Sequence, residues 1–200
     1  MNNPDLSIRR GRQQFLLLAA LFFAPLLLAV VFYFFLPQLQ PSGHTNYGQL
    51  VAPAQPAPDF RFVDAEGKPA DRTVLRGHWS YVYLAARDCD TECQQKLYQM
   101  RQIRTLLNEK RPRVRRIYLA PDLAALQAAQ ALLKPTHPDL HFYALTGEGA
   151  APAEFFKARD PQALYLTDPL ANWLMVYPGD ANSTGILKDI KKLLRLSQIG

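Results

Sequence analysis

Hydrophobic positions along this chain form three patterns: one long uninterrupted run, several short runs, and stripes at helical spacing. The long run covers residues 15–36 and contains no charged side chain. Because about 20 apolar residues cross the hydrocarbon core of a bilayer, this run predicts one transmembrane helix. Pro25 lies inside the run, and membrane-spanning helices tolerate such a residue.

The two flanks of the predicted span differ in charge. Three arginines lie within residues 9–12, and no further Lys or Arg occurs until Arg61. Since cytoplasmic flanks carry the basic excess, the pattern predicts a cytoplasmic tip (1–14), a span in the inner (cell) membrane and a C-terminal part in the periplasm. A cleaved signal peptide is the alternative, but its apolar region has only about 7–15 residues.

Residues 37–58 are rich in Pro, Gln and Ala, and the stretch 51–58 favours extended polyproline conformations. We interpret 37–58 as a spacer that holds a folded domain away from the membrane. The remaining residues, 59–200, are enough for one domain, because single domains commonly have about 100–200 residues.

Short apolar runs alternate with amphipathic stretches throughout this domain. Residues 59–68 predict an opening hairpin, because an alternating run precedes a turn signal. The other predicted strands are residues 80–86, 114–120, 140–145, 163–167 and 173–177, and the predicted helices begin at residue 91 and cover 122–133 and 183–196. Strands that alternate with helices predict an α/β fold in which helices pack on a central sheet.

The first and last predicted helices have the clearest apolar stripes. A capping box of Thr91 and Gln94 starts the first helix, and Pro112 prevents its continuation. Its stripe consists of Leu97, Met100, Ile103, Arg104 and Leu107. The last helix carries Ile186, Leu187, Ile190, Leu193 and Leu194 on one face and Lys188, Lys191, Lys192 and Arg195 on the other. It is therefore expected to lie on the surface with one buried stripe.

The charge pattern excludes one class of partner. The formal net charge of the chain is +6, of which the part after the predicted span carries +4; this is modest and implies no nucleic acid. The densest basic cluster, 110–116, closes one predicted helix and opens a strand. Cations are favourable at a helix C-terminus, which explains part of the cluster. A docking patch for an acidic partner or an anionic lipid is the alternative.

The two cysteines of the chain, Cys89 and Cys93, lie where a predicted core strand leads into a helix. The unpaired N–H groups and the dipole of a helix N-terminus stabilise a thiolate, which is a nucleophile and a soft-metal ligand. At this spacing on a first turn, the two sulfurs can form a disulfide or bind one metal ion from one side.

Neighbouring acidic residues oppose the stabilisation of a thiolate by the helix N-terminus. Asp88, Asp90 and Glu92 disfavour a thiolate through their negative charge. A structural disulfide or a pair of inactive thiols is therefore the alternative, and structural bridges are common outside the cytoplasm. A loop this short removes little chain entropy, which favours a redox or metal-handling role.

The order of these features resembles the Sco/SenC family, whose members are membrane-anchored, thioredoxin-like proteins that help to deliver copper to cytochrome c oxidase. The resemblance covers most of the exported domain. Its motifs, in chain order, are Pro58-Asp59-Phe60 with Asp64-Ala65-Glu66-Gly67-Lys68, Leu75-Arg76-Gly77-His78-Trp79, the pair Cys89-x-x-x-Cys93, and Tyr165-Leu166-Thr167-Asp168-Pro169. The resemblance implies a thioredoxin-like central sheet flanked by helices, preceded by one N-terminal transmembrane helix.

The resemblance also implies a copper site, made by both cysteines and a histidine five residues before the late tyrosine. In this chain the position of that histidine is Asp160, and Asp90 and Gln94 replace prolines that usually surround the family's cysteines. Because Cu(I) prefers thiolate, thioether or imidazole ligands, Asp160 is a poor substitute. Cys89, Cys93 and Asp160 are thus the predicted metal residues, with Cu(I) as the candidate cofactor.

Four histidines and one proline complete the set of candidates. His137 and His141 are alternative imidazole donors, but the polar turn beside them predicts two surface residues. His44 falls in the spacer, and His78 is expected to pack or to cap. Pro161 occupies roughly the place of the cis-proline of thioredoxin-like proteins, although a trans peptide bond is the default.

Three functions are compatible with these residues. The first is a Sco-like accessory factor for cytochrome c oxidase assembly, with an oxidase subunit or another assembly factor as its partner. Cys89 and Cys93 would then bind copper transiently or reduce a partner's disulfide, and the missing histidine favours thiol–disulfide work. The second is a general membrane-tethered thiol–disulfide oxidoreductase, although such enzymes normally have two residues between their cysteines. The third is a non-catalytic Sco-like scaffold.

Overall fold

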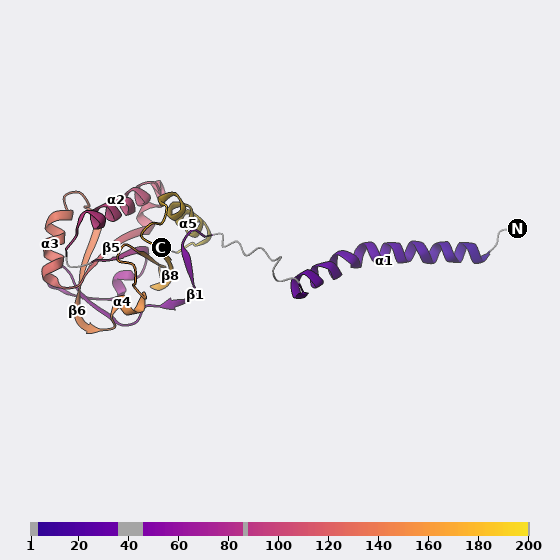
Figure 1. Ribbon diagram of the computed structural model, residues 1–200, viewed down its shortest axis with the longest axis horizontal. Coiled ribbons are helices and arrows are strands. Elements are labelled where there is room, and N and C mark those ends of the chain that lie inside the picture. Colours follow the sequence, from indigo (N-terminus) through magenta and orange to yellow (C-terminus); the bar gives the residue numbers. More distant parts are fainter. Residues whose placement is uncertain (1–3, 36–45, 86–87, 200) are drawn as a thin grey trace. The chain divides into compact units, whose positions relative to one another are not determined.

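The computed structural model describes residues 4–35, 46–85 and 88–199, which fall into two separate compact units. Helix α1 (Pro4–Phe35) belongs to the first unit, and the second unit starts at Asn46 (Figure 1). Within α1, Arg12–Phe35 is long and apolar enough to cross a membrane, and its most apolar window is not buried by other segments. The predicted apolar helix is therefore confirmed, with Leu36 outside the described residues.

The second unit, which we call the domain, is built around one eight-stranded sheet with the order β1-β8-β7-β4-β5-β6-β2-β3. The strands are β1 (Gln49–Pro56), β2 (Phe60–Val63), β3 (Pro69–Asp71), β4 (Trp79–Leu84), β5 (Val114–Ala120), β6 (Leu140–Gly149), β7 (Leu164–Thr167) and β8 (Asn172–Tyr177). β4, β5 and β6 are parallel, and the other neighbouring pairs are antiparallel. β2 and β3 form the predicted hairpin.

Two of the parallel strands, β4 and β5, lie in the middle of the sheet and are buried over nearly their whole length. All of β4 except Leu84 is buried, and all of β5 except Arg115. Strands covered on both faces have such continuous hydrophobic runs. Helices α2 (Thr91–Thr105) and α3 (Leu123–Leu133) connect the consecutive parallel strands. The C-terminal ends of β4 and β5 therefore meet at one edge of the sheet, where the cysteine segment begins.

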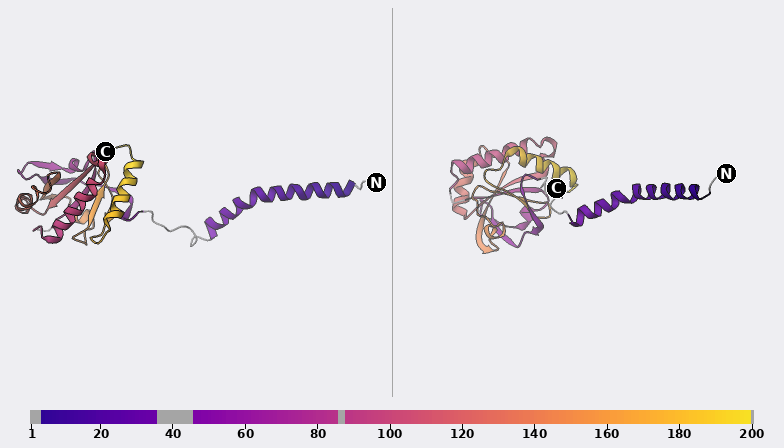
Figure 2. Two further views of the ribbon diagram at one scale, coloured as in Figure 1. Left: turned by 90° about the horizontal axis from the view of Figure 1, so that it is seen from above. Right: turned by 45° about the vertical axis from the view of Figure 1, so that its right-hand side comes forward.

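Helices cover both faces of the sheet (Figure 2). α2, α3 and α5 (Ser183–Leu196) bury their apolar stripes in one core. The opposite face carries the 3-10 helix η2 (Arg72–Leu75), the short helix α4 (Pro152–Phe155) and an aromatic core. In that core Phe156 packs edge-on against Trp173, with ring centroids 5.5 Å apart. The predicted α/β fold, a central sheet flanked by helices, is confirmed.

The predicted spacer 37–58 is wrong in its C-terminal half. β1 lies within it and pairs antiparallel with β8 at the edge of the sheet. Its prolines are tolerated because an edge strand does not need every backbone N–H for pairing. The Ala52–Pro53 peptide bond in β1 is cis, whereas the Asp160–Pro161 bond is trans. Residues 36–45 lie outside the described residues, and the domain starts before residue 59.

A buried carboxylate attaches the start of the domain to α5. Asp189 is 2% exposed, and its Oδ2 accepts hydrogen bonds from the backbone N–H groups of Tyr47 and Gly48, both at 2.9 Å. Gly185 permits this close approach, because a Cβ there would lie 2.7 Å from the Tyr47 ring. The predicted apolar stripe of α5 is confirmed, but it contains this carboxylate, which the pattern did not reveal.

The first predicted helix ends earlier than Pro112. α2 stops at Thr105, and the 3-10 helix η3 (Asn108–Arg113) follows and contains Pro112. Asn108 has a φ of 50°, in the left-handed region that asparagine tolerates better than most residues. A residue in this conformation interrupts a regular helix, so the break occurs before the proline.

Candidate functional site

The cysteines lie where β4 leads into α2, as predicted, with residues 86–87 of the connection outside the described residues. Asp90 is the N-cap of α2, and its side chain accepts a hydrogen bond from the Cys93 N–H at 2.9 Å. The predicted capping box of Thr91 and Gln94 is therefore wrong. Aspartate is the better N-cap residue, and it stands one position earlier.

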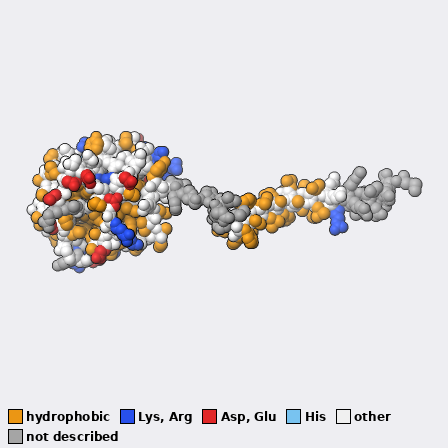
Figure 3. Space-filling model, viewed as in Figure 1, with side chains coloured by type: hydrophobic (Ala, Val, Ile, Leu, Met, Phe, Trp, Pro, Cys, Tyr) orange, Lys and Arg blue, Asp and Glu red, His pale blue; other side chains and the backbone are white. Residues whose placement is uncertain are grey.

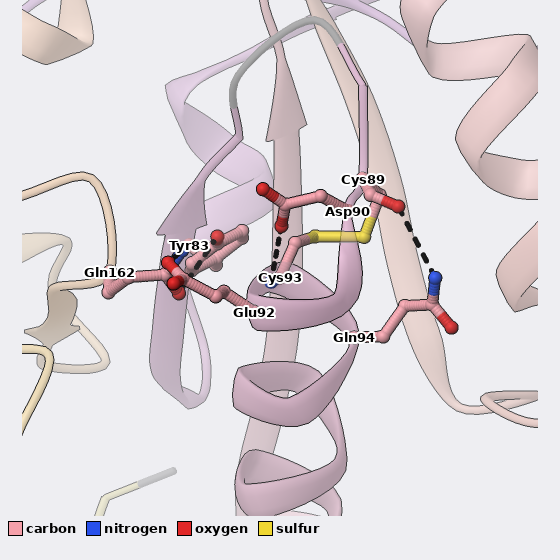
Figure 4. Close-up of a disulfide and its surroundings, with 7 residues drawn as sticks. All are labelled: Tyr83, Cys89, Asp90, Glu92, Cys93, Gln94 and Gln162. Carbon is pink, nitrogen blue, oxygen red and sulfur yellow. Dashed lines mark hydrogen bonds between the residues drawn. A yellow bond between two sulfur atoms is a disulfide. The ribbon is translucent and has the colours of Figure 1, made fainter.

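A disulfide joins Cys89 to Cys93, with the sulfurs 2.01 Å and the Cα atoms 5.2 Å apart (Figure 4). Cys93 is 3% exposed and belongs to the core beneath α2, whereas Cys89 is half-buried at its margin. An incoming thiolate therefore reaches the sulfur of Cys89 more readily than that of Cys93. Of the arrangements that the sequence left open, the structure contains the bridged one.

Weak polar contacts connect the disulfide segment to its surroundings (Figure 4). The Gln94 side-chain amide donates to the Cys89 carbonyl oxygen at 3.4 Å. Gln162, from the loop before β7, accepts from the Tyr83 hydroxyl at 3.4 Å and donates to Glu92 at 3.4 Å. The first turn of α2 is thus linked to a loop that follows it by some seventy positions in the chain.

Two electrostatic influences oppose each other at the disulfide. Cys93 occupies the first turn of α2, where the helix dipole favours a thiolate. Asp88, Asp90 and Glu92 are exposed carboxylates close by in the chain, and their negative charge disfavours one. The balance between the helix dipole and the carboxylates affects how easily the disulfide is reduced, and the reduction potential measures this.

Two tyrosines from adjacent positions of β4 and β5 lie in the same core as Cys93. The ring centroids of Tyr83 and Tyr118 are 6.1 Å apart. Burial raises the pKa of Tyr83, and it raises the pKa of Tyr118 to about 12. Both hydroxyls therefore stay protonated at physiological pH and remain hydrogen-bond donors. The Tyr118 hydroxyl is buried, with no hydrogen-bond partner among the described residues.

Asp160 has a structural task. Its Oδ1 accepts from the Gln162 N–H at 2.8 Å and its Oδ2 from the Gly179 N–H at 2.6 Å. Lys96 on α2 donates to the Gly179 carbonyl at 2.5 Å, and burial lowers the pKa of this lysine against the opposing effect of Asp160 and Asp180. These residues line a cavity of about 870 Å³ to which neither cysteine contributes. Asp160 thus joins two loops and does not face the sulfurs across a shared cavity.

No histidine in the described part of the chain joins the cysteines in a group that could hold a metal ion. The predicted surface position is wrong for His137, which is 4% exposed with its Nδ1 3.3 Å from the buried Arg116 Nη1. His141 is exposed, His78 is half-buried before β4, and His44 lies outside the described residues. Across residues 4–35, 46–85 and 88–199, no three His, Cys, Asp or Glu side chains are arranged to hold a metal ion.

One family model matches more than half of the chain. It describes the transmembrane-like, thioredoxin-like, C-terminal domain, and it matches residues 79–197. The chain belongs to this family. The match runs from the first residue of β4 to just past α5, so the disulfide lies inside the thioredoxin-like domain. None of the curated proteins matches the sequence.

Solved Sco structures share the fold of this thioredoxin-like domain. Sco1 from Thermus thermophilus is 18% identical, with a TM-score of 0.59, over 76% of this chain and 99% of that chain. ScoI from Arabidopsis thaliana with copper bound is 19% identical, with a TM-score of 0.54, over 72% of this chain and 100% of that chain. BsSco, a member of the Sco family of cytochrome c oxidase assembly proteins with an identified disulfide switch, is 22% identical, with a TM-score of 0.53, over 74% and 99%. Such identities show the fold.

The residues of this thioredoxin-like domain do not fit a copper ion. Cys89 and Cys93 are bonded to each other, and Cu(I) needs further soft ligands. Asp160 offers only carboxylate oxygens, both of which accept backbone hydrogen bonds, and His137 contacts a buried arginine. No copper-dependent step follows from this geometry.

Beneath α2, the thioredoxin-like domain contains an ion-pair network that the sequence analysis missed. Arg116 is fully buried, and its Nη2 and Nε donate to Asp139 Oδ1 and Oδ2 at 2.5 and 3.2 Å. Its Nη1 donates to the Leu97 carbonyl at 3.1 Å, and Arg104 adds a second cation 2.9 Å from Asp139. Although burial opposes it, the hydrogen bond and charge of Arg116 lower the pKa of Asp139. The sequence did contain a signal for this network: Arg116 lies inside a predicted buried strand, and a buried charge needs a partner.

A second member of the basic cluster 110–116 also has a structural role. Arg113 donates to the carbonyl oxygens of Leu194, Ser197 and Ile199, each at 2.8 Å. It therefore stabilises the C-terminus of α5, where a cation is favourable. The prediction that the cluster stabilises the end of the preceding helix is therefore wrong for Arg113, which contacts the end of α5.

Proposed function

We propose that this protein is a membrane-anchored accessory factor for assembly of a respiratory terminal oxidase, and that it acts by thiol–disulfide exchange through Cys89 and Cys93. α1 would anchor it in the inner membrane with residues 1–14 in the cytoplasm and the domain in the periplasm. The half-buried disulfide at the N-terminus of α2 carries this proposal. The Sco-like fold and the description of BsSco as an assembly protein with a disulfide switch support it.

The proposed reaction starts from the reduced protein. The Cys89 thiolate attacks one sulfur of a partner's disulfide, and the partner's other sulfur leaves as a thiolate. The Cys93 thiolate then attacks Cys89 in the mixed disulfide, which releases the partner's remaining thiolate and forms the bridge seen here. Two electrons pass to the partner, whose thiolates take up protons from water.

The proposal assigns different roles to the two sulfurs because their exposure differs. Cys89 is half-buried and would meet the partner, whereas Cys93 is buried at the N-terminus of α2 and would resolve the mixed disulfide. A dithiol protein of the same compartment would reduce the bridge again after each cycle. Without such a donor, an oxidising compartment would keep the bridge closed.

The reduction potential separates this function from a structural bridge. We expect the Cys89–Cys93 couple to lie above about −300 mV, because a bridge that turns over must be accessible to cellular dithiols. Equilibration of the full chain with dithiothreitol mixtures, followed by alkylation and mass spectrometry, measures it. A value below that limit would identify a stable structural bridge and contradict the exchange reaction.

Copper transfer by the cysteines is the second candidate function, favoured by copper-bound structures of the same fold such as ScoI from Arabidopsis thaliana. We expect the reduced full chain, titrated with Cu(I) under anaerobic conditions, to bind no more copper than a variant with Cys89→Ser and Cys93→Ser. The physical reason is that, among the described residues, no histidine joins the two cysteines in a group that could hold a metal ion. Stoichiometric binding that depends on the cysteines would restore the copper hypothesis.

A further inference from the structure

A basic groove lies between α5 and the segment that follows α2, away from the disulfide. Its volume is about 600 Å³, and its basic lining residues are Lys110, Lys188, Lys191, Lys192 and Arg195. Glu109 is the one acidic residue of the lining. Some Lys and Arg side chains lie at the edge of the domain near α5 in the space-filling view (Figure 3). The groove therefore offers concentrated positive charge to a ligand with several negative charges.

Exposed apolar side chains accompany the basic ones. Leu106 lines the groove and is 52% exposed, and Leu196, next to Arg195, is 70% exposed. Tyr47 is 59% exposed, and Lys188 lies over its ring, with Nζ 5.4 Å from the centroid and 3.2 Å from the hydroxyl. Basic groups beside leucine and tyrosine are typical of surfaces that bind in the headgroup region of a bilayer.

The chain enters the domain beside this groove. Asp189 on α5 holds the N–H groups of Tyr47 and Gly48, one position along the helix from Lys188. Residues 36–46 connect this point to the end of α1, and a chain of that length spans at most about 40 Å. If α1 crosses a membrane, the point where the chain enters the domain stays within that reach of the membrane end of α1. The tether therefore gives the groove a high effective concentration of lipid headgroups.

We infer that this groove binds anionic phospholipid headgroups of the membrane that α1 spans. Its positive charge complements the lipid phosphates, its exposed leucines and tyrosine fit the headgroup region, and the tether keeps both within reach. α2 runs from the disulfide at its first turn to the groove at its last, and its length is about 22 Å. Docking by this groove would leave the disulfide away from the lipid and open to a protein partner.

Lysine labelling of the full chain in lipid nanodiscs tests this inference without any substitution. One preparation contains phosphatidylcholine only, and the other contains phosphatidylcholine with phosphatidylglycerol. We expect acetylation of Lys188 and Lys191 to be about fivefold slower with the anionic lipid and to recover at high salt. The exposed Lys68 and Lys157 should react equally in both preparations.

Charge reversal gives the matched control. The pair Lys188→Glu and Lys191→Glu should abolish the protection of Lys110, whereas Lys68→Glu with Lys157→Glu, which changes the net charge equally, should preserve it. Equal labelling in the two lipid preparations would overturn the inference. Protection that appears only in native membranes containing the oxidase would also overturn it and would identify an acidic protein as the ligand. Neither measurement involves the thiols, so the result is independent of the proposed exchange reaction.

Discussion

Replacing both cysteines, by Cys89→Ser and Cys93→Ser, is expected to reduce oxidase assembly to the level of cells that lack the protein. A serine hydroxyl cannot take part in thiol–disulfide exchange, so the proposed reaction loses both of its sulfur atoms. The measurement is terminal oxidase activity in membranes from cells that express the variant in place of the natural protein. Immunoblotting of the same membranes establishes that the variant is present in equal amount.

Loss of oxidase assembly through unfolding of the variant can be distinguished from loss through the missing thiol–disulfide exchange. Closing a loop as short as that between Cys89 and Cys93 contributes about 2 kcal/mol at most in the chain-entropy model. The variant should therefore remain folded, with a moderately lower unfolding midpoint and unchanged circular dichroism. A folded variant that supports normal oxidase assembly would contradict exchange through these cysteines and favour the non-catalytic scaffold.

Asp139→Ala is expected to destabilise the domain by about 3 kcal/mol. This change leaves the fully buried Arg116 without its counter-charge, and removal of one partner from a buried ion pair costs about 3–5 kcal/mol. We expect the lower end because the Asp139 side chain is 31% exposed. Urea unfolding of the full chain in detergent, followed by tryptophan fluorescence, measures the loss.

A second variant tests whether the uncompensated charge is the cause. Asp139→Ala combined with Arg116→Met removes both charges, so it should be more stable than Asp139→Ala alone. The pH dependence gives a further check. The pKa of Asp139 is lowered in the folded state, so its contribution is present above about pH 4 and is lost as the pH falls through the folded value. The natural chain and Asp139→Ala should therefore converge in strongly acidic solution, and a constant difference would exclude the ion pair.

Patterns that are complete within a short segment were predicted well. The strand 114–120 and the helix 183–196 were correct at both ends, because the sequence pattern of each has clear boundaries. Because the strand before them and the helix after them were predicted, Cys89 and Cys93 were correctly placed at a strand-to-helix junction. The same local approach chose the wrong N-cap, because Thr91 and the neighbouring Asp90 are both acceptable caps and only the backbone geometry distinguishes them.

Features that depend on partners far along the chain were not predicted. The residues of β1 were interpreted as part of a spacer because their prolines favour extended polyproline conformations. Only the place of β1 at the edge of the sheet, beside β8, makes these prolines acceptable in a strand. His137 belongs to a polar turn in the sequence, but the same turn supplies Asp139 to Arg116 and is therefore held against the core.

The sequence by itself determined an apolar helix of membrane-spanning length, an α/β domain, and two cysteines at a helix start, because each is encoded by neighbouring residues. The tertiary structure decided how those parts are used. It assigned the oxygens of Asp160 to Gln162 and Gly179, attached Asp189 to the entry of the chain, and arranged the basic face of α5 around a groove. These outcomes depend on side chains that only folding brings together, and no local pattern specifies them.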